Sequence, residues 1–258
     1  MKRRSFIRNS ALAAGAAMTA GAVKGTEVPI SKKDFYELKV YQLTGRGSVV
    51  QLRKYYTDAV IPFLNSIGAK VGLFTEYGME EPPKMYILHV YKKPEDYFDA
   101  VVKMRTDRRF LDAAQTFFEI PADRPVYERY ETFLMTAFDA IPEIKMPDEN
   151  RSLIELRTYE SYNEDAARRK IMMFNDEELP LFEKVGLHPL FFGQVLAGRY
   201  MPALIYMLWF KDLEERDANW QKFITSEEWK KMSSKEIYAD TVSKVKKKFL
   251  TPMEISQI

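Results

Sequence analysis

The chain carries the same sequence pattern twice. The segment Tyr36-Glu-Leu-Lys-Val-Tyr41 recurs as Ile154-Glu-Leu-Arg-Thr-Tyr159, and this register, a shift of 118 from position 36 to position 154, holds without a gap as far as Phe74 and Phe192. Self-similarity at a fixed spacing indicates a structural unit that is used more than once. We therefore expect two similar halves, and the residues that both copies keep are the first candidates for a shared role.

The first 22 residues differ in character from the rest. Paired arginines within Lys2–Arg8 precede a weakly apolar run, Ala11–Ala20, and small residues follow it. This order resembles a twin-arginine export signal, which combines a charged start, a short apolar run and a small-residue cleavage point. We expect residues 1–22 to be removed on export to the periplasm or another extracytoplasmic space. Residues 23–33 are then a linker, and the processed chain is not expected to insert into a membrane.

Charge and cysteine content argue against several classes of function. The formal charge of +2 depends on the signal, because without its four basic residues 35 basic side chains stand against 37 acidic ones. Nucleic acid is not an expected partner, since it requires a concentrated basic face. The basic run Lys244–Lys248 is predicted to be a solvated helix face, and the acidic run Asp176–Glu178 is also predicted to be solvated. The chain has no cysteine, so a disulfide, a thiolate nucleophile or a thiolate metal site cannot form.

The first half, residues 34–135, alternates extended and helical patterns. A helical pattern over 48–67 contains Pro62, which should kink or divide it, and Gly68, which should end it. A second helix is predicted over 94–118. The predicted strands are 35–43, 71–77, 85–91 and 126–135. The order β-α-β-β-α-β is that of the ferredoxin-like unit.

The second half, residues 152–258, repeats this order after a linker at 136–151. The predicted strands are 153–160, 190–197, 203–211 and 249–254, and the predicted helical segments are 163–185 and 213–247. Beyond the hairpin the best register is 119, which makes Asp107 and Ser226 equivalent, each a suitable N-cap before an aromatic residue. The second helix of each half should therefore be broken in two. The expected fold class is α+β, with two tandem ferredoxin-like units.

Motifs of the second half resemble the NIPSNAP family. They are the strand Glu155-Leu-Arg-Thr-Tyr159, the helix end Leu179-Pro-Leu-Phe182 before Gly186, and the aromatic and acidic series from Leu208-Trp-Phe210 through Trp220 to Trp229. The first half fits less well, with Lys39 in place of the arginine and Val101 in place of Trp220. The resemblance implies a dimeric α/β barrel whose two ferredoxin-like units face each other through their sheets, here as an intramolecular pseudo-dimer. It implies no well-defined molecular activity.

Strand parity predicts which residues line the space between the sheets. In each first strand one face is apolar and should cover the helices, with Tyr36, Leu38 and Val40 in the first copy. The other face is polar and should point into the barrel; it carries Glu37, Lys39, Tyr41, Glu155, Arg157 and Tyr159. These side chains could form a pocket for a small polar or partly aromatic molecule. The alternative is that each glutamate neutralises its basic neighbour and ties the structure together.

The tryptophans and histidines are weaker candidates. We expect Trp209, Trp220 and Trp229 mainly in the core, with a place in a pocket wall as the alternative. His89 and His188 have no acidic residues nearby at metal-ligand spacing, so neither a metal nor a cofactor is expected. Some members of the barrel superfamily bind haem, so the resemblance leaves an axial role for either histidine as the less favoured alternative.

Three classes of function follow. The leading hypothesis is an exported protein that binds a small ligand between its sheets, with no catalytic activity assigned. The second is a cofactor-poor or haem-linked oxygenase or isomerase in the same cavity, with Glu37, Tyr41, Glu155 and Tyr159 as acid or base candidates; a raised carboxylate pKa would favour it. The third is a protein-interaction module with an exposed apolar patch. A homo-oligomer through other surfaces is compatible with each of them.

Overall fold

The computed structural model describes residues 32–78 and 80–258, and its first half contains four strands with helices between them. The strands are β1 (Phe35–Leu43), β2 (Lys70–Glu76), β3 (Lys84–Tyr91) and β4 (Tyr127–Ala137). The helices are α1 (Arg46–Tyr55), α2 (Ile61–Ser66), α3 (Pro94–Lys103) and α4 (Arg108–Phe118), and a π-helical turn, η1 (Tyr56–Val60), joins α1 to α2.

The second half has the same order of elements. Its strands are β5 (Leu153–Glu160), β6 (His188–Ala197), β7 (Ala203–Phe210) and β8 (Lys244–Pro252). Its helices are α5 (Glu164–Met173), α6 (Leu179–Val185), α7 (Leu213–Thr225) and α8 (Glu227–Ser233). A π-helical turn, η2 (Phe174–Glu178), joins α5 to α6, and a short 3₁₀ turn, η3 (Glu236–Tyr238), precedes β8.

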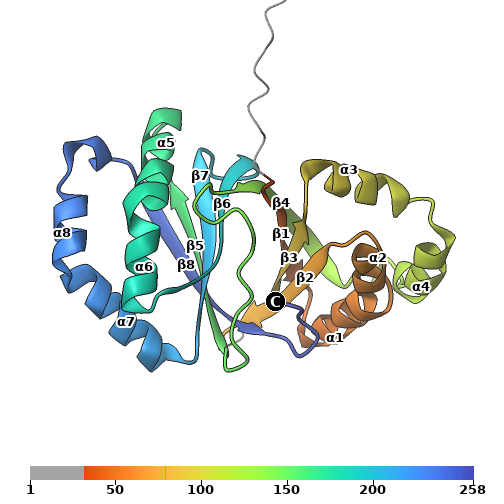
Figure 1. Cartoon of the computed structure of the whole chain (residues 1–258). Helices are drawn as coiled ribbons and strands as arrows, with labels where there is room; N and C mark the ends of the chain where they lie inside the picture. The colour runs from red at the N-terminus through yellow and green to blue at the C-terminus, as the bar shows by residue number, and fades with distance from the viewer. Residues whose placement is uncertain (1–31, 79) are drawn as a thin grey trace, which may run out of the picture. The chain divides into compact units, whose positions relative to one another are not determined.

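The eight strands form one closed antiparallel barrel (Figure 1), in the order β1-β3-β2-β8-β5-β7-β6-β4. Each half contributes four neighbouring strands. The halves join where β2 pairs with β8 and where β4 pairs with β6. The prediction of an α+β fold built around a barrel is confirmed.

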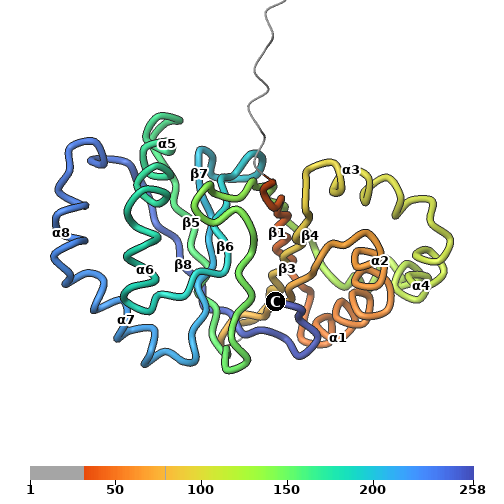
Figure 2. The backbone as a smooth tube through the Cα atoms, viewed as in Figure 1, coloured from red at the N-terminus to blue at the C-terminus, as the bar shows by residue number. Residues whose placement is uncertain are grey.

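Helices cover the barrel in two groups, α1–α4 beside the strands of the first half and α5–α8 beside those of the second (Figure 2). Under each group lies an outer core, which includes Leu52 and Ile87 in the first half and Phe182 and Tyr206 in the second. A third core fills the barrel interior with apolar side chains from both halves. An eight-stranded barrel is just wide enough for its interior to be filled by side chains. Both faces of the sheet are therefore buried over much of its area.

Proline divides the first helix of each half, as predicted for Pro62. Pro62 and Pro180 lie in the first turns of α2 and α6, each directly after a π-helical turn. Because proline has no N–H to continue the helical hydrogen-bond ladder, the regular α-helix is interrupted at these positions. Gly68 and Gly186 follow these helices with φ angles of 80° and 82°, the left-handed conformation that favours glycine after a helix.

The second helix of each half is broken in two, also as predicted. The side chain of Asp107 accepts a hydrogen bond from the backbone N–H of Phe110 at 2.9 Å, which caps α4. Ser226 accepts one from the N–H of Trp229 at 3.2 Å, which caps α8. Each cap satisfies a backbone donor that would have no partner at a helix start.

The basic run Lys244–Lys248 is the first part of β8, not the helix face that was predicted. It pairs with β5, where Lys246 lies opposite Thr158 and Lys248 opposite Leu156. The repeat contained the signal, because the first half ends in a long strand, predicted at 126–135, and a second copy of the same unit should end in a strand of similar length. On a strand these two lysines share one face. That face is the inner surface of the barrel.

Candidate functional site

A cavity of about 440 Å³ opens in the end of the barrel where β1 and β5 finish. Both halves contribute to its wall, with β1, β3 and β4 from the first and β5, β7 and β8 from the second. Apolar side chains form the deep part, among them Leu38, Phe133, Leu156 and Ile205. Polar and charged side chains gather at the rim, among them Lys84, Glu131, Lys246 and Lys248. The volume is within the usual range for small-molecule sites.

The strand register explains this lining. Residues that pair across an antiparallel ladder point to the same side of the sheet. The sets of partners are Val40 with Tyr86 and Glu131, and Thr158 with Ile205 and Lys246. The even-numbered residues of β1 and β5 and their partners therefore line the barrel interior.

Below the cavity the interior is closely packed. Tyr36, Phe191 and Ile258 are fully buried there. Gly72 makes this packing possible, since a Cβ atom at that position would lie only 2.8 Å from the Phe74 ring and 3.2 Å from the Ile258 side chain. The cavity therefore has a floor.

The polar residues of the first strands lie on the opposite side of the sheet from the one predicted. Glu37, Lys39, Tyr41, Glu155, Arg157 and Tyr159 occupy the space between the sheet and the helices, whereas Tyr36, Leu38 and Leu156 belong to the barrel interior. The prediction assumed that apolar helix stripes must meet the most apolar strand face. In a closed barrel the interior takes that face. The helices then pack on a mixed face whose charges are paired.

In the second half, Glu155 is the centre of a hydrogen-bonded network. Its fully buried carboxylate accepts two bonds from Arg216, one from Arg157 Nη1 at 2.9 Å and one from the Trp220 indole at 2.8 Å. Burial raises the pKa of Glu155, but the hydrogen bonds and charges of Arg216 and Arg157 outweigh it and hold the pKa below 4.5. An ionised, fully bonded carboxylate suits a structural tie better than an acid or base. The Arg157 guanidinium also lies 4.3 Å from the centre of the Trp220 ring.

In the first half, the equivalent Glu37 pairs with a histidine. His89 Nδ1 lies 2.8 Å from Glu37 Oε2, and Lys39 Nζ lies 3.4 Å from Oε1. Burial raises the pKa of Glu37, but His89 and Lys39 together lower it below its ordinary value. Burial also lowers the pKa of His89. Nε2 of His89 is buried and has no hydrogen-bond partner within the described part of the chain.

A buried ion pair that sequence reasoning missed lies between α5 and η2. Lys170 Nζ is 2.6 Å from Glu178 Oε2, and both side chains are at most 5% exposed. Burial raises the pKa of Glu178, and Lys170 opposes this effect. The prediction of a solvated acidic run is therefore wrong for Glu178. The repeat could have indicated this burial, because the equivalent residues of the first half, Leu52 and Val60, are apolar, and both are buried in the structure.

None of the three tryptophans lines the cavity. Trp220 and Trp229 pack on Phe223 in the outer core of the second half. Trp209 packs against the barrel interior, and the ring of His188 stacks on it with 4.3 Å between the centres. The polar contact that a tryptophan does make, from Trp220 to Glu155, belongs to the network under the helices.

The surroundings of the two histidines do not fit a haem. The His89 ring is enclosed by the rings of Tyr56 and Tyr91, whose centres lie 5.8 and 6.2 Å away. His188 stacks on a tryptophan, and its Nε2 lies 3.4 Å from Glu215. An axial ligand needs open space for the macrocycle beside its nitrogen. Within residues 32–78 and 80–258, no three acidic or histidine side chains gather as a metal-binding group.

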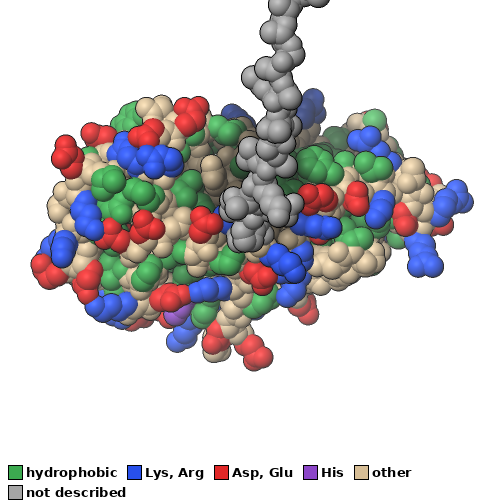
Figure 3. Space-filling view, turned by 45° about the horizontal axis from the view of Figure 1, so that its top comes forward, with side chains coloured by type: hydrophobic (Ala, Val, Ile, Leu, Met, Phe, Trp, Pro, Cys, Tyr) green, Lys and Arg blue, Asp and Glu red, His purple; other side chains and the backbone are tan. Residues whose placement is uncertain are grey.

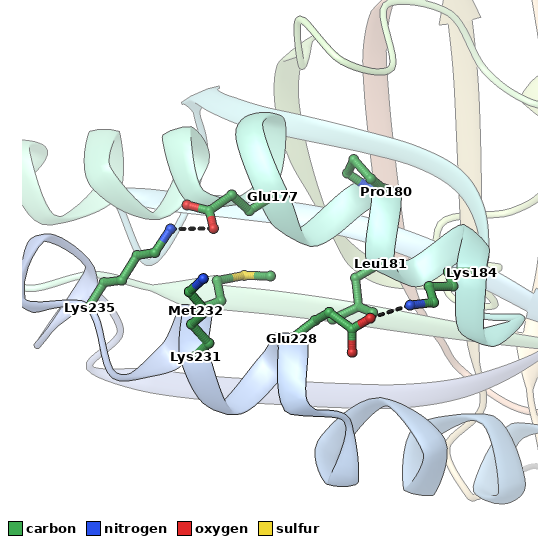
Figure 4. A pocket seen from close by; sticks show the side chains of 8 residues that line it. All are labelled: Glu177, Pro180, Leu181, Lys184, Glu228, Lys231, Met232 and Lys235. Atoms are coloured by element: carbon green, nitrogen blue, oxygen red, sulfur yellow. Dashed lines mark hydrogen bonds and ion pairs between the residues drawn. The ribbon is translucent and has the colours of Figure 1, made fainter.

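A second hollow, of about 420 Å³, lies between α6 and α8 (Figure 4). Two ion pairs cross it, Lys184 of α6 with Glu228 of α8, and Glu177 of η2 with Lys235, which follows α8. These charged groups already satisfy one another, and only the second half contributes to the wall. We therefore interpret this hollow as a groove of helix packing.

The remaining surface is mixed in character. Figure 3 shows acidic and basic side chains interspersed over the face that it draws. On α3, Phe98 and Val102 are 60% and 63% exposed, and this is the surface that a protein-interaction function would use. Among the described residues, no helix has the length and apolar character needed to cross a membrane.

Comparison with solved structures shows a shared fold. A Fusobacterium nucleatum protein provisionally assigned as a monooxygenase has 9% identity and a TM-score of 0.59, over 87% of this chain and 94% of that one. A Lactobacillus acidophilus protein with the same provisional assignment has 10% identity and a TM-score of 0.54, over 86% and 94%. An anthrone oxidase-like protein has 9% identity and a TM-score of 0.55, over 86% and 92%. At these identities the likeness concerns the fold alone.

Comparison by sequence is informative for the second half. Residues 154–257 match the model of the NIPSNAP family. No curated protein matches the chain significantly by sequence. The matched segment begins in β5 and ends five residues after β8. The chain therefore contains a NIPSNAP domain in its second half, within an eight-stranded barrel.

Proposed function

We propose that this protein is exported and binds a small molecule in the barrel, between two related ferredoxin-like units, residues 34–135 and 152–258. The observation that carries the proposal is the cavity itself, which has an apolar floor, a polar rim and walls from both halves. The twin-arginine-like start of the sequence supports export. The repeated order of elements supports the two related units.

The chemistry of the wall favours a ligand with an apolar or partly aromatic body. The deep residues Leu38, Phe133 and Leu156 offer only apolar atoms, so a body that leaves water there gains the hydrophobic contribution. Orientation would come from the few polar groups near the rim, as in most small-molecule sites. Tyr86 is already engaged, because its hydroxyl donates to Glu76 Oε1 at 3.1 Å.

The neutral dye N-phenyl-1-naphthylamine tests this proposal, because its fluorescence rises when it leaves water. The full chain should bind it, and Val40→Trp, which adds bulk to the cavity wall, should weaken binding about tenfold or more, as expected when a side chain occupies a ligand's space. Val102→Trp adds the same bulk on the exposed face of α3 and should change nothing. Absence of dye binding by a folded protein, or equal effects of the two variants, would contradict the proposal.

A second candidate function is proton-transfer chemistry at His89, favoured by its unpartnered Nε2 and its bond to Glu37. One structural neighbour, described as anthrone oxidase-like, suggests anthrone as the trial substrate. Nε2 would take a proton from C10, the resulting anion would add O₂ and recover the proton as a hydroperoxide, and loss of water would give the quinone. The enclosure of His89 by tyrosine rings places this candidate second.

Oxygen uptake with anthrone, corrected for the uncatalysed reaction, tests the second candidate. His89→Gln should abolish the protein-dependent rate, because glutamine cannot accept the proton at neutral pH. His188→Gln, the matched control at the other histidine of the chain, should leave the rate unchanged. Equal rates with and without the protein would rule out this chemistry for anthrone.

A further inference from the structure

The inner face of β8 brings lysines to the mouth of the barrel. Lys246 and Lys248 alternate with outward-facing residues, and Lys84 of β3 lines the same cavity from the first half. Lysine is unusual on the inner face of a barrel, because an ammonium group is costly to bury. These three residues are placed where their amines can reach both the cavity and solvent.

The ionic partners of these lysines leave a positive excess. Lys246 Nζ is 2.5 Å from Glu160, and Lys248 Nζ is 3.3 Å from Glu76. Within the described residues, Lys84 has no acidic side chain within 4.0 Å. Glu131, the acidic residue that lines the wall, is already paired with Arg199. On the inner face the rim therefore has one uncompensated ammonium group, that of Lys84, together with N–H donors on two paired ones; Lys247 also borders the cavity but lies opposite Arg157, on the outer face of β8.

The apolar part of the cavity lies directly inside this rim. Lys248 lies opposite Leu156 on the strand ladder, and the wall continues to Leu38 and Phe133. A molecule that occupied this space would meet apolar atoms at its inner end and ammonium groups at its outer end. A single negative charge at the outer end would accept charge-assisted hydrogen bonds and offset the excess.

Resting on the proposed function of the same cavity, we propose that the ligand class is the amphipathic monoanion. Such a ligand has an apolar aliphatic or aromatic body and one terminal carboxylate or sulfonate. The body lies against the floor, and the anionic group lies among Lys84, Lys246 and Lys248. A neutral molecule of the same shape would lose the contacts at the rim, and a cation would be repelled there.

Two dyes with the same ring system separate charge from shape. 8-Anilinonaphthalene-1-sulfonate carries a sulfonate that N-phenyl-1-naphthylamine lacks. The full chain should bind the sulfonate about tenfold or more tightly than the neutral dye at low salt. The preference should shrink in about 0.5 M salt, because added ions screen charges that solvent can reach.

Lysine variants identify the groups responsible. Lys84→Gln removes the inner-face ammonium that has no acidic partner, so it should weaken sulfonate binding severalfold without affecting folding. The triple variant, which adds Lys246→Gln and Lys248→Gln, should remove the preference for the sulfonate over the neutral dye. Neutral-dye binding should stay constant in both variants. Lys231→Gln, on the groove between α6 and α8, is the control and should change neither affinity. Thermal melting confirms that each variant is folded.

The two proposals fail in different ways. Equal affinity for both dyes, or equal weakening of both by the lysine variants in folded protein, would overturn the anion inference and leave the cavity as a site for neutral molecules. Absence of binding by both dyes would overturn the cavity proposal as well.

Discussion

Replacing Arg157 with methionine should lower the free energy of unfolding and leave the barrel cavity unaffected. Methionine keeps an apolar stem but removes the hydrogen bond to Glu155 at 2.9 Å and the contact with the Trp220 ring at 4.3 Å. A hydrogen bond to a charged group contributes about 1.5–3 kcal/mol, and a partly desolvated cation–π contact about 1–2 kcal/mol. Arg216 continues to neutralise Glu155, so the loss should be about 2–4 kcal/mol, toward the lower end of what breaking a buried ion pair costs.

Urea unfolding at pH 7, followed by circular dichroism, measures this loss. Lys39→Met is the matched control in the first half, where the amine is 3.4 Å from Glu37 and His89 still bonds the carboxylate. Its loss should be below about 1 kcal/mol, as for a partly exposed pair. Both variants should bind N-phenyl-1-naphthylamine like the unmodified chain. If Arg157→Met kept its stability and lost the dye, the side chain would belong to the ligand site and our assignment of the inner face would be wrong.

Three further predictions concern the second half. Because the pKa of Glu155 is lowered on folding, its contribution to stability is present above about pH 4.5 and is lost as the pH falls through the pKa of the folded state. Glu155→Gln should therefore flatten the acidic part of a plot of urea midpoint against pH. An unchanged slope would contradict the lowered pKa. Lys170→Leu should lower the free energy of unfolding by about 3–5 kcal/mol, because it leaves Glu178 buried without a partner. The double variant Lys170→Leu/Glu178→Val, which introduces the residues found at the matching positions of the first half, should be neutral or stabilising. Thermal melting of both variants decides this, and a double variant no more stable than the single one would refute it. Ser226→Ala should cost about 1 kcal/mol through loss of the α8 cap, with Ser234→Ala as the exposed control, and equal small losses in urea would count against the cap.

The fold could be read from the sequence because its signals are local and occur twice. Pro62 and Pro180, together with the glycines that follow them, mark the same helix division in both halves. The one misassigned segment, Lys244–Lys248, has a composition that suits an exposed helix. Pairing with β5 outweighs that preference, since this strand, whose last residues pair with β2, is needed to close the barrel.

The position of the site could not be read in the same way, because parity states which residues share a face and not where that face points. On β1 the two faces carry Leu38 and Val40 on one side and Glu37 and Lys39 on the other. Either assignment is consistent with one buried face. Only closure of the barrel, a relation among eight strands far apart in sequence, decides that the apolar set lies inside. The pairing of His89 with Glu37 could not be predicted for a similar reason, since it depends on the register between β1 and β3.

Because one chain forms the whole barrel, the mouth can have a polarity that two identical subunits could not produce. The inner position opposite Val40 on β4 is Glu131, whereas the matching position opposite Thr158 on β8 is Lys246. Likewise Phe133 of β4 corresponds to Lys248 of β8. Two-fold symmetry would place each charge at both positions, because every residue of a symmetric dimer occurs twice around the axis. The two halves of this chain are free to differ, so the lysines of β8 lie on one side of the mouth, and a ligand with one charged end should bind in a single orientation.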